Sequence, residues 1–339
     1  MAIRQFEYMA QEALGSLDIR IPRWEDNDLE DVPCPLCRSE SRDVIRKRPD
    51  GLVVNLCSRC GLLFVSPRPS DLALAKFYSD YMLLHGRGDY RSEDYWMGIR
   101  NSQYALATSD PRILFLVSHG IKIRGMRVLD VGCGNGSFLL KCRRLGASSV
   151  VGVEPEKKMA NAAKSHLDIE VYDGYLENMP EDKGLFDLVV LWDVLEHLSD
   201  PCRVMRQIVE RLEPDGAIAA MTPNAGGFRT EGMGWTGFRV DFEHVCYYTK
   251  EVAAFLFSSA DCHLVTATPF GYPVLDDPAR TGKNEGWANS FIFPSVRRAP
   301  FLAATLTKLY SIMPVVKNKG RNSLGSYHLF LLGRKGKGA

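Results

Sequence analysis

The chain has 339 residues, of which 45% are hydrophobic and 24% are charged, and its formal net charge is +1. This much apolar material can bury a large core, so the length predicts one large domain with smaller modules. The near-neutral charge gives no general sign of nucleic-acid binding. No stretch reaches the roughly twenty apolar residues that span a bilayer, and the N-terminal residues lack the apolar core of a signal peptide. We therefore expect a cytoplasmic protein.

A cysteine-rich segment, residues 34–70, follows an acidic extension over residues 1–33. It holds two Cys-x-x-Cys pairs separated by 19 residues. Thiolates at this spacing bind Zn²⁺ tetrahedrally, and two matched pairs are typical of a structural zinc ribbon, not of a redox site. Four protein ligands close the coordination sphere, so we expect the metal to stabilise the fold and not to catalyse. The predicted zinc ligands are Cys34, Cys37, Cys57 and Cys60.

Residues 71–123 are predicted to form a helical linker or cap. Ser70 is a suitable N-cap for a helix over 71–81. The rest of the segment carries aromatic residues that would either pack between helices or roof a cofactor site. They are Tyr90, Tyr95, Trp96 and Tyr104.

From Arg127 onward, short apolar strands alternate with helical stretches. This alternation predicts an α/β fold of the Rossmann-like kind, a parallel sheet with helices on its faces, and such sheets bind ligands at the carboxyl ends of their strands. The predicted strands are 127–131, 150–154, 168–172, 186–192 and 216–221, and the predicted helices are 137–145, 156–166 and 200–212. A helix after 249 and a late antiparallel strand, 327–332, would complete the sheet.

The first of these strands ends in a glycine-rich loop. The loop reads Asp130-Val131-Gly132-Cys133-Gly134-Asn135-Gly136, and Glu154 ends the next strand. Glycines let the backbone turn sharply against a ligand, and an acid about twenty residues further on is placed to accept hydrogen bonds from a ribose. The GxGxG spacing differs from the GxGxxG of dinucleotide sites. The sequence therefore predicts a nucleoside-cofactor site of another kind.

The loop, Glu154 and the segment 186–197 resemble the ordered motifs of class I S-adenosylmethionine-dependent methyltransferases. The resemblance covers about residues 124–270. It implies that the loop holds the methionine end of the cofactor, that Glu154 holds the ribose, and that residues after the third strand flank the adenine. Tyr175 departs from the family pattern, which often has an acid there. The implied cofactor-binding residues are Asp130, Gly132, Cys133, Gly134, Gly136, Glu154, Pro155, Asp173, Gly174, Tyr175, Trp192 and Asp193.

The cysteine-rich segment points to a narrower group within this family of methyltransferases. A zinc ribbon, an apolar strand, a Pro-Arg-Pro turn and a helix with Phe77-Tyr78 are similar to the N-terminal module of methyltransferases that tailor glycans and natural products. The implied reaction is in-line transfer of a methyl group to a small-molecule acceptor, with a saccharide or a nucleotide- or carrier-linked sugar as the leading candidate. The methyltransferase domain would span 124–339, with acceptor-side insertions at about 224–248 and 272–325.

Three residues near the strand ends are candidates for a general base, should the acceptor need one. They are His244, His197 and Asp193, with His244 first because it lies in the insertion 224–248. The glycines of that insertion predict a mobile lid over the acceptor. The sequence leaves an acceptor oxygen, nitrogen or carbon open.

The C-terminal residues 286–339 contain nine Lys or Arg and no acid. Apolar positions at helical spacing within 297–321 predict either packing on the domain itself or contact with a membrane surface or anionic carrier. The second case would place the protein peripherally at the inner membrane surface.

Two other functions stay open at this point. Some ribosomal RNA methyltransferases join a four-ligand zinc site to this fold, and a cofactor-binding scaffold without activity would share the same motifs. The zinc segment is only modestly basic, and Trp192-Asp193-Val194-Leu195 stands where amino-group methyltransferases carry an Asn-Pro-Pro-aromatic signature. We therefore expect no nucleic-acid partner.

Overall fold

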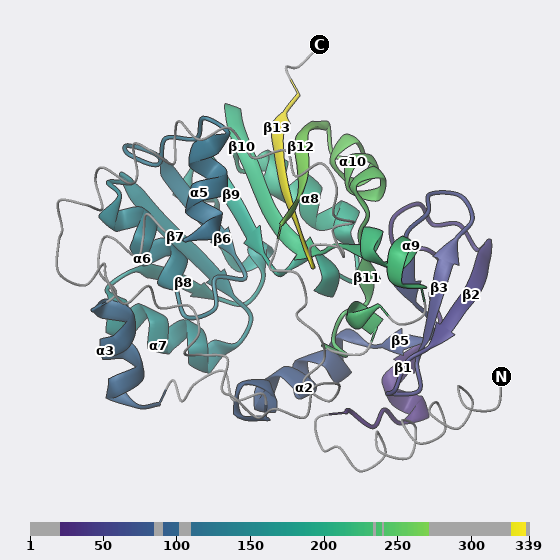
Figure 1. Ribbon diagram of the computed structural model, residues 1–339. Coiled ribbons are helices and arrows are strands. Elements are labelled where there is room, and N and C mark those ends of the chain that lie inside the picture. The colour runs from purple at the N-terminus through teal and green to yellow at the C-terminus, as the bar shows by residue number, and fades with distance from the viewer. Residues whose placement is uncertain are drawn as a thin grey trace, which may run out of the picture.

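The computed structural model describes residues 21–84, 91–101, 110–232, 235–238, 241–270 and 327–336 (Figure 1). The predicted insertion 272–325 and the basic segment 297–321 lie outside these residues. None of the described helices is long and apolar enough to cross a membrane.

A seven-stranded sheet organises most of the chain, with the order β12-β13-β10-β9-β6-β7-β8. Strand β13 runs antiparallel to β10 and β12, and the other neighbouring pairs are parallel. This confirms the predicted Rossmann-like α/β sheet and its late antiparallel strand, whereas β12 is a strand that the sequence pattern did not predict. The strands are β6 (Arg127–Val131), β7 (Ser149–Glu154), β8 (Glu170–Asp173), β9 (Phe186–Trp192), β10 (Leu212–Pro223), β12 (Cys262–Phe270) and β13 (His328–Lys335).

The direction in which successive strands are added to the sheet reverses between β6 and β9. From β6 the chain moves outward through β7 to β8, and it then returns to β9 on the other side of β6. In open α/β sheets, ligands bind in the crevice at such a reversal, beyond the carboxyl ends of the strands. The loops after β6 and β9 therefore flank the expected binding position.

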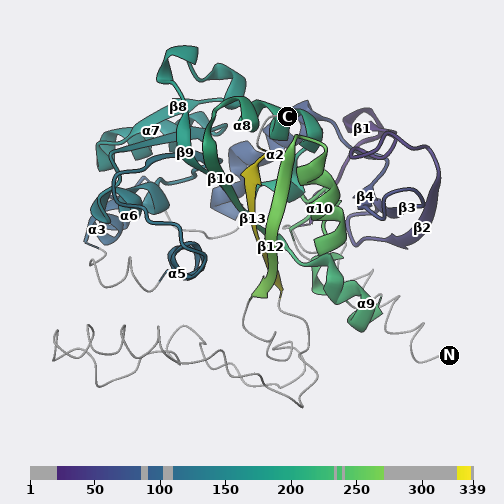
Figure 2. The same cartoon turned by 90° about the horizontal axis from the view of Figure 1, so that it is seen from above.

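Helices cover both faces of this sheet (Figures 1 and 2). Adjacent strand residues point to opposite faces, so Val128 packs in one buried cluster and Leu129 in the other. The first cluster contains apolar residues of α3 (Glu93–Arg100), α5 (Pro111–Ser118), α6 (Ser137–Arg144) and α7 (Lys157–Leu167), and the second those of α8 (Pro201–Glu210) and α10 (Lys250–Ser258).

The ends of these helices follow from local sequence. Asp110 and Asp200 cap α5 and α8 through side-chain oxygens that accept backbone N–H groups, and a proline occupies the first turn of each helix. Proline suits this position because the N–H that it lacks would have no helical partner there. The Ser70 hydroxyl accepts the Ala73 N–H at 3.3 Å at the start of α2 (Asp71–Leu84), as the sequence predicts.

The N-terminal module is a four-stranded sheet that includes a strand from far along the chain. Its order is β11-β4-β3-β2, and β11 pairs antiparallel with β4. The strands are β2 (Arg42–Lys47), β3 (Val53–Cys57), β4 (Leu63–Val65) and β11 (Cys246–Tyr247). A small two-stranded sheet pairs β1 (Leu29–Glu30) with β5 (Arg68–Pro69). The module is therefore completed by residues of the predicted insertion 224–248.

The described part of this insertion differs from the expected lid. Trp235 is 2% exposed and Phe238 is fully buried, and both pack with Val54 and Tyr247 in a third apolar cluster. The short α9 (Phe228–Glu231) lies in the same segment. The glycines of the insertion predicted a mobile backbone. The aromatic side chains between them bury apolar surface and thereby hold the segment on the module.

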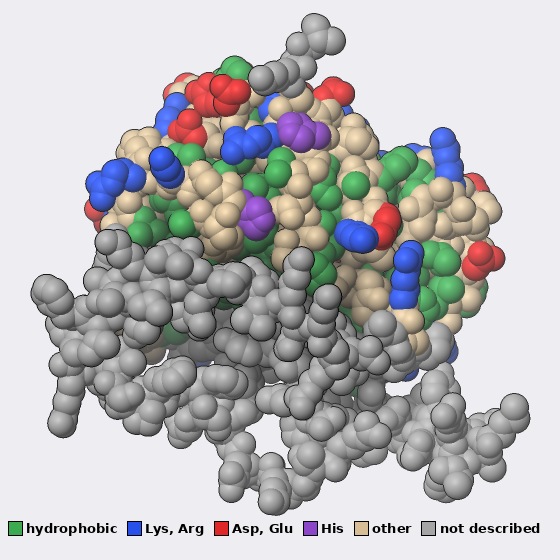
Figure 3. Space-filling view, turned by 45° about the horizontal axis from the view of Figure 1, so that its top comes forward, with side chains coloured by type: hydrophobic (Ala, Val, Ile, Leu, Met, Phe, Trp, Pro, Cys, Tyr) green, Lys and Arg blue, Asp and Glu red, His purple; other side chains and the backbone are tan. Residues whose placement is uncertain are grey.

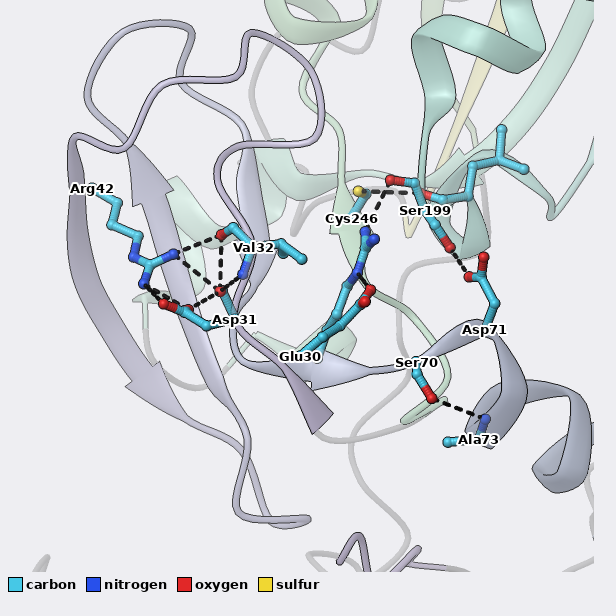
Figure 4. Close-up of polar contacts among 12 residues, drawn as sticks. Glu30, Asp31, Val32, Arg42, Ser70, Asp71, Ala73, Ser199 and Cys246 are labelled. Carbon is cyan, nitrogen blue, oxygen red and sulfur yellow. Dashed lines mark hydrogen bonds and ion pairs between the residues drawn. The ribbon is translucent and has the colours of Figure 1, made fainter. Parts of the chain in front are cut away.

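Polar contacts also join the module to the larger sheet (Figure 4). Arg68 donates to a carboxylate oxygen of Glu30 at 3.0 Å and to the Ser199 carbonyl at 2.9 Å. The Ser199 hydroxyl donates to the carboxylate of Asp71, the first residue of α2. These bonds tie β1, β5 and α2 to the turn that precedes α8.

A buried contact joins Arg48 of the module to the segment 242–247. The Arg48 side chain is paired with Asp50, and the two side chains are 1% and 0% exposed. The guanidinium also donates to the carbonyls of His244 and Phe242 at 2.6 and 2.7 Å, and to the Tyr247 hydroxyl at 2.9 Å. One residue of the module thus holds the backbone of the segment that carries His244.

We expect Arg48→Met to lower the free energy of unfolding by about 3 to 5 kcal/mol, because the buried Asp50 carboxylate would lose its counter-charge. Urea unfolding of the purified variant measures this. Arg38→Met is the matched control, since the Arg38–Asp200 pair is 59% and 29% exposed and should contribute less than about 1 kcal/mol. Equal effects of the two substitutions would contradict the assignment.

Candidate functional site

The glycine-rich loop follows β6 and turns toward the reversal point of the sheet. Gly132, Gly134 and Gly136 have φ angles of 75°, 52° and 69°, which favour glycine. A Cβ at Gly132 would lie 2.6 Å from Val194, and one at Gly136 would lie 2.4 Å from Ile169. A Cβ at Gly134 would meet no described atom within 4 Å. Gly132 and Gly136 therefore allow close packing of neighbouring side chains, and Gly134 leaves its backbone open to a ligand.

Glu154, at the end of β7, is fixed next to this loop by two backbone amides. Its Oε2 accepts the Gly134 N–H at 2.8 Å, and its Oε1 accepts the Glu156 N–H at 2.9 Å. Burial raises the pKa of Glu154 above its ordinary value, although the two amide donors lower it. Each carboxylate oxygen has a second lone pair, so the side chain is oriented and can still accept the two hydroxyls of a ribose.

Asp130 is a buried carboxyl without a full set of partners. It is 2% exposed, and among the described residues its Oδ1 has no hydrogen-bond partner. Burial raises the pKa of Asp130 to about 8, and the nearby Arg112 opposes this rise. A buried carboxyl oxygen that has no described hydrogen-bond partner, such as Oδ1 of Asp130, would suit a ligand with an N–H or cationic group at the loop.

Arg112, on α5, is a site residue that the sequence analysis missed. It binds both Asp110 oxygens, at 3.0 and 2.7 Å, and its guanidinium lies 4.9 Å from the ring centroid of Phe138. It acts electrostatically on Asp130 and Asp193, which follow different strands. No periodicity or motif marks this arginine, because its role depends on where α5 packs.

Helix α3 supplies a second missed contact. The Tyr95 hydroxyl accepts a hydrogen bond of 2.6 Å from the Asn135 side chain, inside the glycine-rich loop. Trp96 is fully buried and stacks on His166 of α7. These contacts hold α3 beside the loop, where the aromatic residues were expected either to pack or to roof a site.

The predicted adenine-side residues lie beyond β8. Asp173 is exposed and lies 3.7 Å from the Lys157 amine, and Tyr175 is 56% exposed. The Gly174 N–H donates to the Glu154 carbonyl at 2.9 Å, which brings this turn next to the predicted ribose ligand. Pro155 is exposed in the neighbouring turn. The roles of these residues stay predictions.

Two predicted cofactor neighbours have buried side chains. Trp192 is 7% exposed and packs edge-on against Phe138 and Phe330. Cys133 is 8% exposed and occupies the space that a Cβ at Gly152 would fill. Their side chains pack the core at this edge, and any cofactor contact through them stays a prediction.

The three candidate bases gather beyond β9. Asp193 follows this strand directly, is exposed, and has a positive φ of 55°. His197 belongs to the next turn, η4 (Leu195–His197), and its ring packs against the His244 ring with centroids 4.7 Å apart. His244 Nε2 lies 3.9 Å from Oε1 of Glu196. Glu196 is therefore a further residue of this group that the sequence analysis did not select.

Glu196 is 1% exposed, and in the described chain neither of its carboxyl oxygens has a hydrogen-bond partner of good geometry. Burial raises the pKa of Glu196 well above its ordinary value, and the acids Asp193 and Asp241 raise it further. One ligand atom from each of Glu196, His197 and His244 lies within 4.8 Å of the others.

The four cysteines of the N-terminal module form one cluster. Their sulfur atoms lie within 4.8 Å of one another, with 3.5 Å between Cys34 and Cys60 and between Cys37 and Cys57. A tetrahedral zinc with bonds of about 2.3 Å separates its sulfurs by about 3.8 Å. In each pair the N–H of the following residue, Arg38 or Gly61, donates to the carbonyl of the first cysteine. The donor set and spacing fit one zinc ion.

Residues 100–267 match a family model described as a methyltransferase domain. This part of the chain is a methyltransferase domain. The match includes the glycine-rich loop, Glu154, Asp193 and the segment of His244.

Curated relatives of the domain include two enzymes named ubiquinone biosynthesis O-methyltransferase. One, from Neisseria meningitidis serogroup C, is 30% identical over 141 residues, which are 40% of this chain and 59% of the relative. The other, from Xanthomonas oryzae pv. oryzae, is 33% identical over 135 residues, 38% of this chain and 56% of the relative. The chain thus spans less than two thirds of the relatives that it matches.

Among solved structures, the magnesium protoporphyrin IX methyltransferase of Synechocystis PCC 6803 with bound SAH is 14% identical. The alignment covers 78% of this chain and 100% of that chain, with a TM-score of 0.47. An S-adenosylmethionine dependent methyltransferase from Mesorhizobium loti is 18% identical over 68% of this chain and 100% of that chain, with a TM-score of 0.44.

The high pKa of Asp130 predicts a pH dependence of stability in the ligand-free protein. Between the ordinary pKa of 3.8 and the folded value of about 8, the folded chain keeps a proton that the unfolded chain has lost. This carboxyl should therefore lower the free energy of unfolding as pH rises through that window, by at most about 1.4 kcal/mol per pH unit. Asp130→Asn should lack this slope.

Urea unfolding of wild type and variant at several pH values in that window measures the difference. Asp173→Asn is the control, because its carboxyl is exposed and its removal should leave the wild-type slope. Parallel curves for wild type and Asp130→Asn would show that this carboxyl does not carry the proton.

Proposed function

We propose that this protein transfers the methyl group of S-adenosylmethionine to a small-molecule acceptor, and that the acceptor is a saccharide or a nucleotide- or carrier-linked sugar. The observation that carries the proposal is the Glu154 carboxylate, which two backbone amides orient beside the open Gly134. The methyltransferase domain and the O-methyltransferases among its relatives support a methyl donor and a small acceptor.

When bound, S-adenosylmethionine supplies a methyl group on a sulfonium that a nucleophile can displace. The residues of this chain fit it at two points. Glu154 can accept hydrogen bonds from the ribose hydroxyls, and the orphaned Oδ1 of Asp130 suits the ammonium of the methionine end, directly or through water. Gly132 and Gly136 hold the loop in the shape that brings these groups together.

On the acceptor side, we propose that His244, His197 and Asp193 activate the group that receives the methyl. These residues lie beyond β9 and β10, on the other side of the reversal point from β7 and Glu154. A positioned acceptor gains most of its rate from alignment, worth roughly 7 to 11 kcal/mol in well-oriented reactions. Proton removal adds to this when the acceptor is a hydroxyl.

Surface charge supports a small acceptor over RNA. On the face that Figure 3 shows, the described Lys and Arg side chains are scattered among acidic, polar and apolar groups. Nucleic-acid sites depend on clustered positive charge along a face. This face of the described residues has no such stripe.

Glu154→Gln should weaken binding of S-adenosylmethionine and S-adenosylhomocysteine by about 1 to 3 kcal/mol, roughly 5- to 150-fold, because the half-buried acceptor for the ribose loses its charge. Calorimetric titration measures both affinities. Glu181→Gln, at an exposed position in the turn η3 (Glu181–Lys183), should bind like wild type. Unchanged affinity of Glu154→Gln would remove the central support for the proposal.

We further propose that the cysteine cluster holds one structural zinc ion. Cys57→Ser should abolish the zinc content and lower the thermal midpoint, since metal binding at such sites is coupled to folding. Elemental analysis and calorimetric unfolding of the same sample measure both. Cys262→Ser is the control, because Cys262 is buried but lies on β12, outside the cluster. A wild-type protein purified without zinc under metal-replete conditions would contradict the proposal.

Activity itself is tested with labelled S-adenosylmethionine and a panel of nucleotide sugars and glycolipids. The expected result is label in a sugar product, carried on oxygen. Label transferred to RNA instead, or tight cofactor binding with no transfer to any acceptor, would favour the two alternative functions.

A further inference from the structure

Tyr327 lies at the end of the sheet where the candidate bases gather, although it follows them at a long distance in the sequence. It directly precedes β13, and because β13 runs antiparallel to β10, the start of β13 lies beside the carboxyl end of β10. The Tyr327 carbonyl accepts the Asn224 N–H at 2.6 Å, just beyond β10. The last strand therefore brings a tyrosine to the carboxyl edge of the parallel strands, where ligands bind in such sheets.

Backbone contacts bring β11 and η4 to the same place. Asn224 forms an isolated bridge with Tyr248, which directly follows β11. The Val245 N–H donates to the Glu196 carbonyl at 2.8 Å, so the segment before β11 is held against η4. These two elements carry two of the candidate bases, and Tyr327 is thereby placed beside them.

The hydroxyl of Tyr327 is the buried end of a half-buried side chain. Among the residues that the structure describes, this hydroxyl has no hydrogen-bond partner. Buried tyrosine hydroxyls usually have such a partner, and a buried polar group without one destabilises the fold. Phenylalanine would fill the same space without this cost. The hydroxyl therefore suits a hydrogen-bond partner that a ligand brings.

Two buried tyrosines nearby differ from Tyr327 in this respect. The Tyr247 hydroxyl accepts a hydrogen bond from Arg48 at 2.9 Å, and the Tyr248 hydroxyl donates to the Leu195 carbonyl at 3.2 Å. Both of these hydroxyls contribute to the fold. Within the described chain, the Tyr327 hydroxyl makes no contact of this kind.

The surroundings of Tyr327 fix its hydroxyl as a hydrogen-bond donor. Burial raises the pKa of Tyr327, and three nearby acids raise it further, Asp241, Glu196 and Asp193. A phenol in these surroundings keeps its proton. It does not take the proton of an acceptor hydroxyl, so that task stays with the candidate bases.

We propose that Tyr327 is an acceptor-binding residue, whose hydroxyl donates a hydrogen bond to an oxygen atom of the acceptor. This inference rests on the proposed function. A donor on the oxygen that attacks the methyl group would withdraw electron density from it, so the bonded oxygen is a neighbouring one. The acceptor is therefore a molecule with two adjacent oxygens, such as the vicinal hydroxyls of a sugar. Side chains at this end of the sheet move to admit it, and the bond forms away from water, where it is stronger.

The first test needs no acceptor. Tyr327→Phe should unfold at a urea midpoint equal to or higher than that of wild type, because it removes a buried hydroxyl without a described protein partner. Tyr248→Phe is the matched control and should unfold at a lower midpoint, since it removes the bond to Leu195. A midpoint of Tyr327→Phe as low as that of Tyr248→Phe would overturn the inference, by showing that the hydroxyl serves the fold.

The second test measures methyl transfer from labelled S-adenosylmethionine to UDP-glucose, GDP-mannose and caffeic acid, which all carry adjacent hydroxyls. Tyr327→Phe should lower kcat/KM for the acceptor roughly 5- to 150-fold, the range for a lost hydrogen bond in a site shielded from water. Its affinity for S-adenosylhomocysteine, measured by calorimetry, should stay that of wild type. Tyr172→Phe should match wild type in both measurements, because Tyr172 lies on β8 and donates to Glu170. An unchanged kcat/KM of Tyr327→Phe would refute the assignment.

Monodeoxy analogues of the methylated sugar identify the bonded oxygen. At one position wild type should lose rate with the analogue and Tyr327→Phe should not, because the two groups no longer interact. Equal losses in wild type and variant at every position would overturn the inference and leave the proposed function standing. Transfer to caffeic acid and to no sugar would reject the saccharide acceptor, whereas a lower kcat/KM of Tyr327→Phe with caffeic acid would still support the role of Tyr327.

Discussion

The proposed acceptor side of this molecule depends on one buried guanidinium. Arg48 lies in the N-terminal module, yet it binds two backbone carbonyls and a hydroxyl of the segment 242–247, nearly two hundred residues away. The same segment supplies β11, which pairs with β4 of the module. Without these contacts His244 would lie on a loop rich in glycine. The cysteine module therefore acts as part of the scaffold of the site, and any metal that stabilises the module also stabilises the position of His244.

The two sides of the site are built in different ways. The predicted cofactor side comes from one continuous stretch of the chain. The strands β6, β7 and β8 each lead into a turn that carries residues predicted to bind the cofactor. The acceptor side combines η4, the insertion before β11 and the module. Local contacts form at a low entropic cost of loop closure, whereas the second set closes long loops. Burial of Trp235, Phe238 and Tyr247 compensates for that cost.

This difference also explains what the sequence could predict. Strand periodicity and glycine spacing are local signals, and β6, β7 and β9 with the loop after β6 lie where those signals placed them. Arg48, Arg112 and Glu196 gain their roles only from contacts across the fold, so no spacing marks them. The described aromatic residues of the expected lid pack on the module for a related reason. Glycine content reports backbone freedom in an isolated segment, but the burial of Trp235 depends on an apolar surface that is distant in the sequence.

Electrostatics link the two sides. Asp130, Glu154, Asp193 and Glu196 all lie at the carboxyl edge of the sheet, and burial raises the pKa of the three that are enclosed. Arg112 offsets part of the charge of these acids, because it acts electrostatically on Asp130 and Asp193, and a cationic ligand would offset more of it. On the proposed function, the donor arrives with a positive sulfonium and departs neutral, so the acids attract the donor more than the product. Transfer of the methyl group removes the charge that favoured binding, and this site thereby assists release of the spent cofactor.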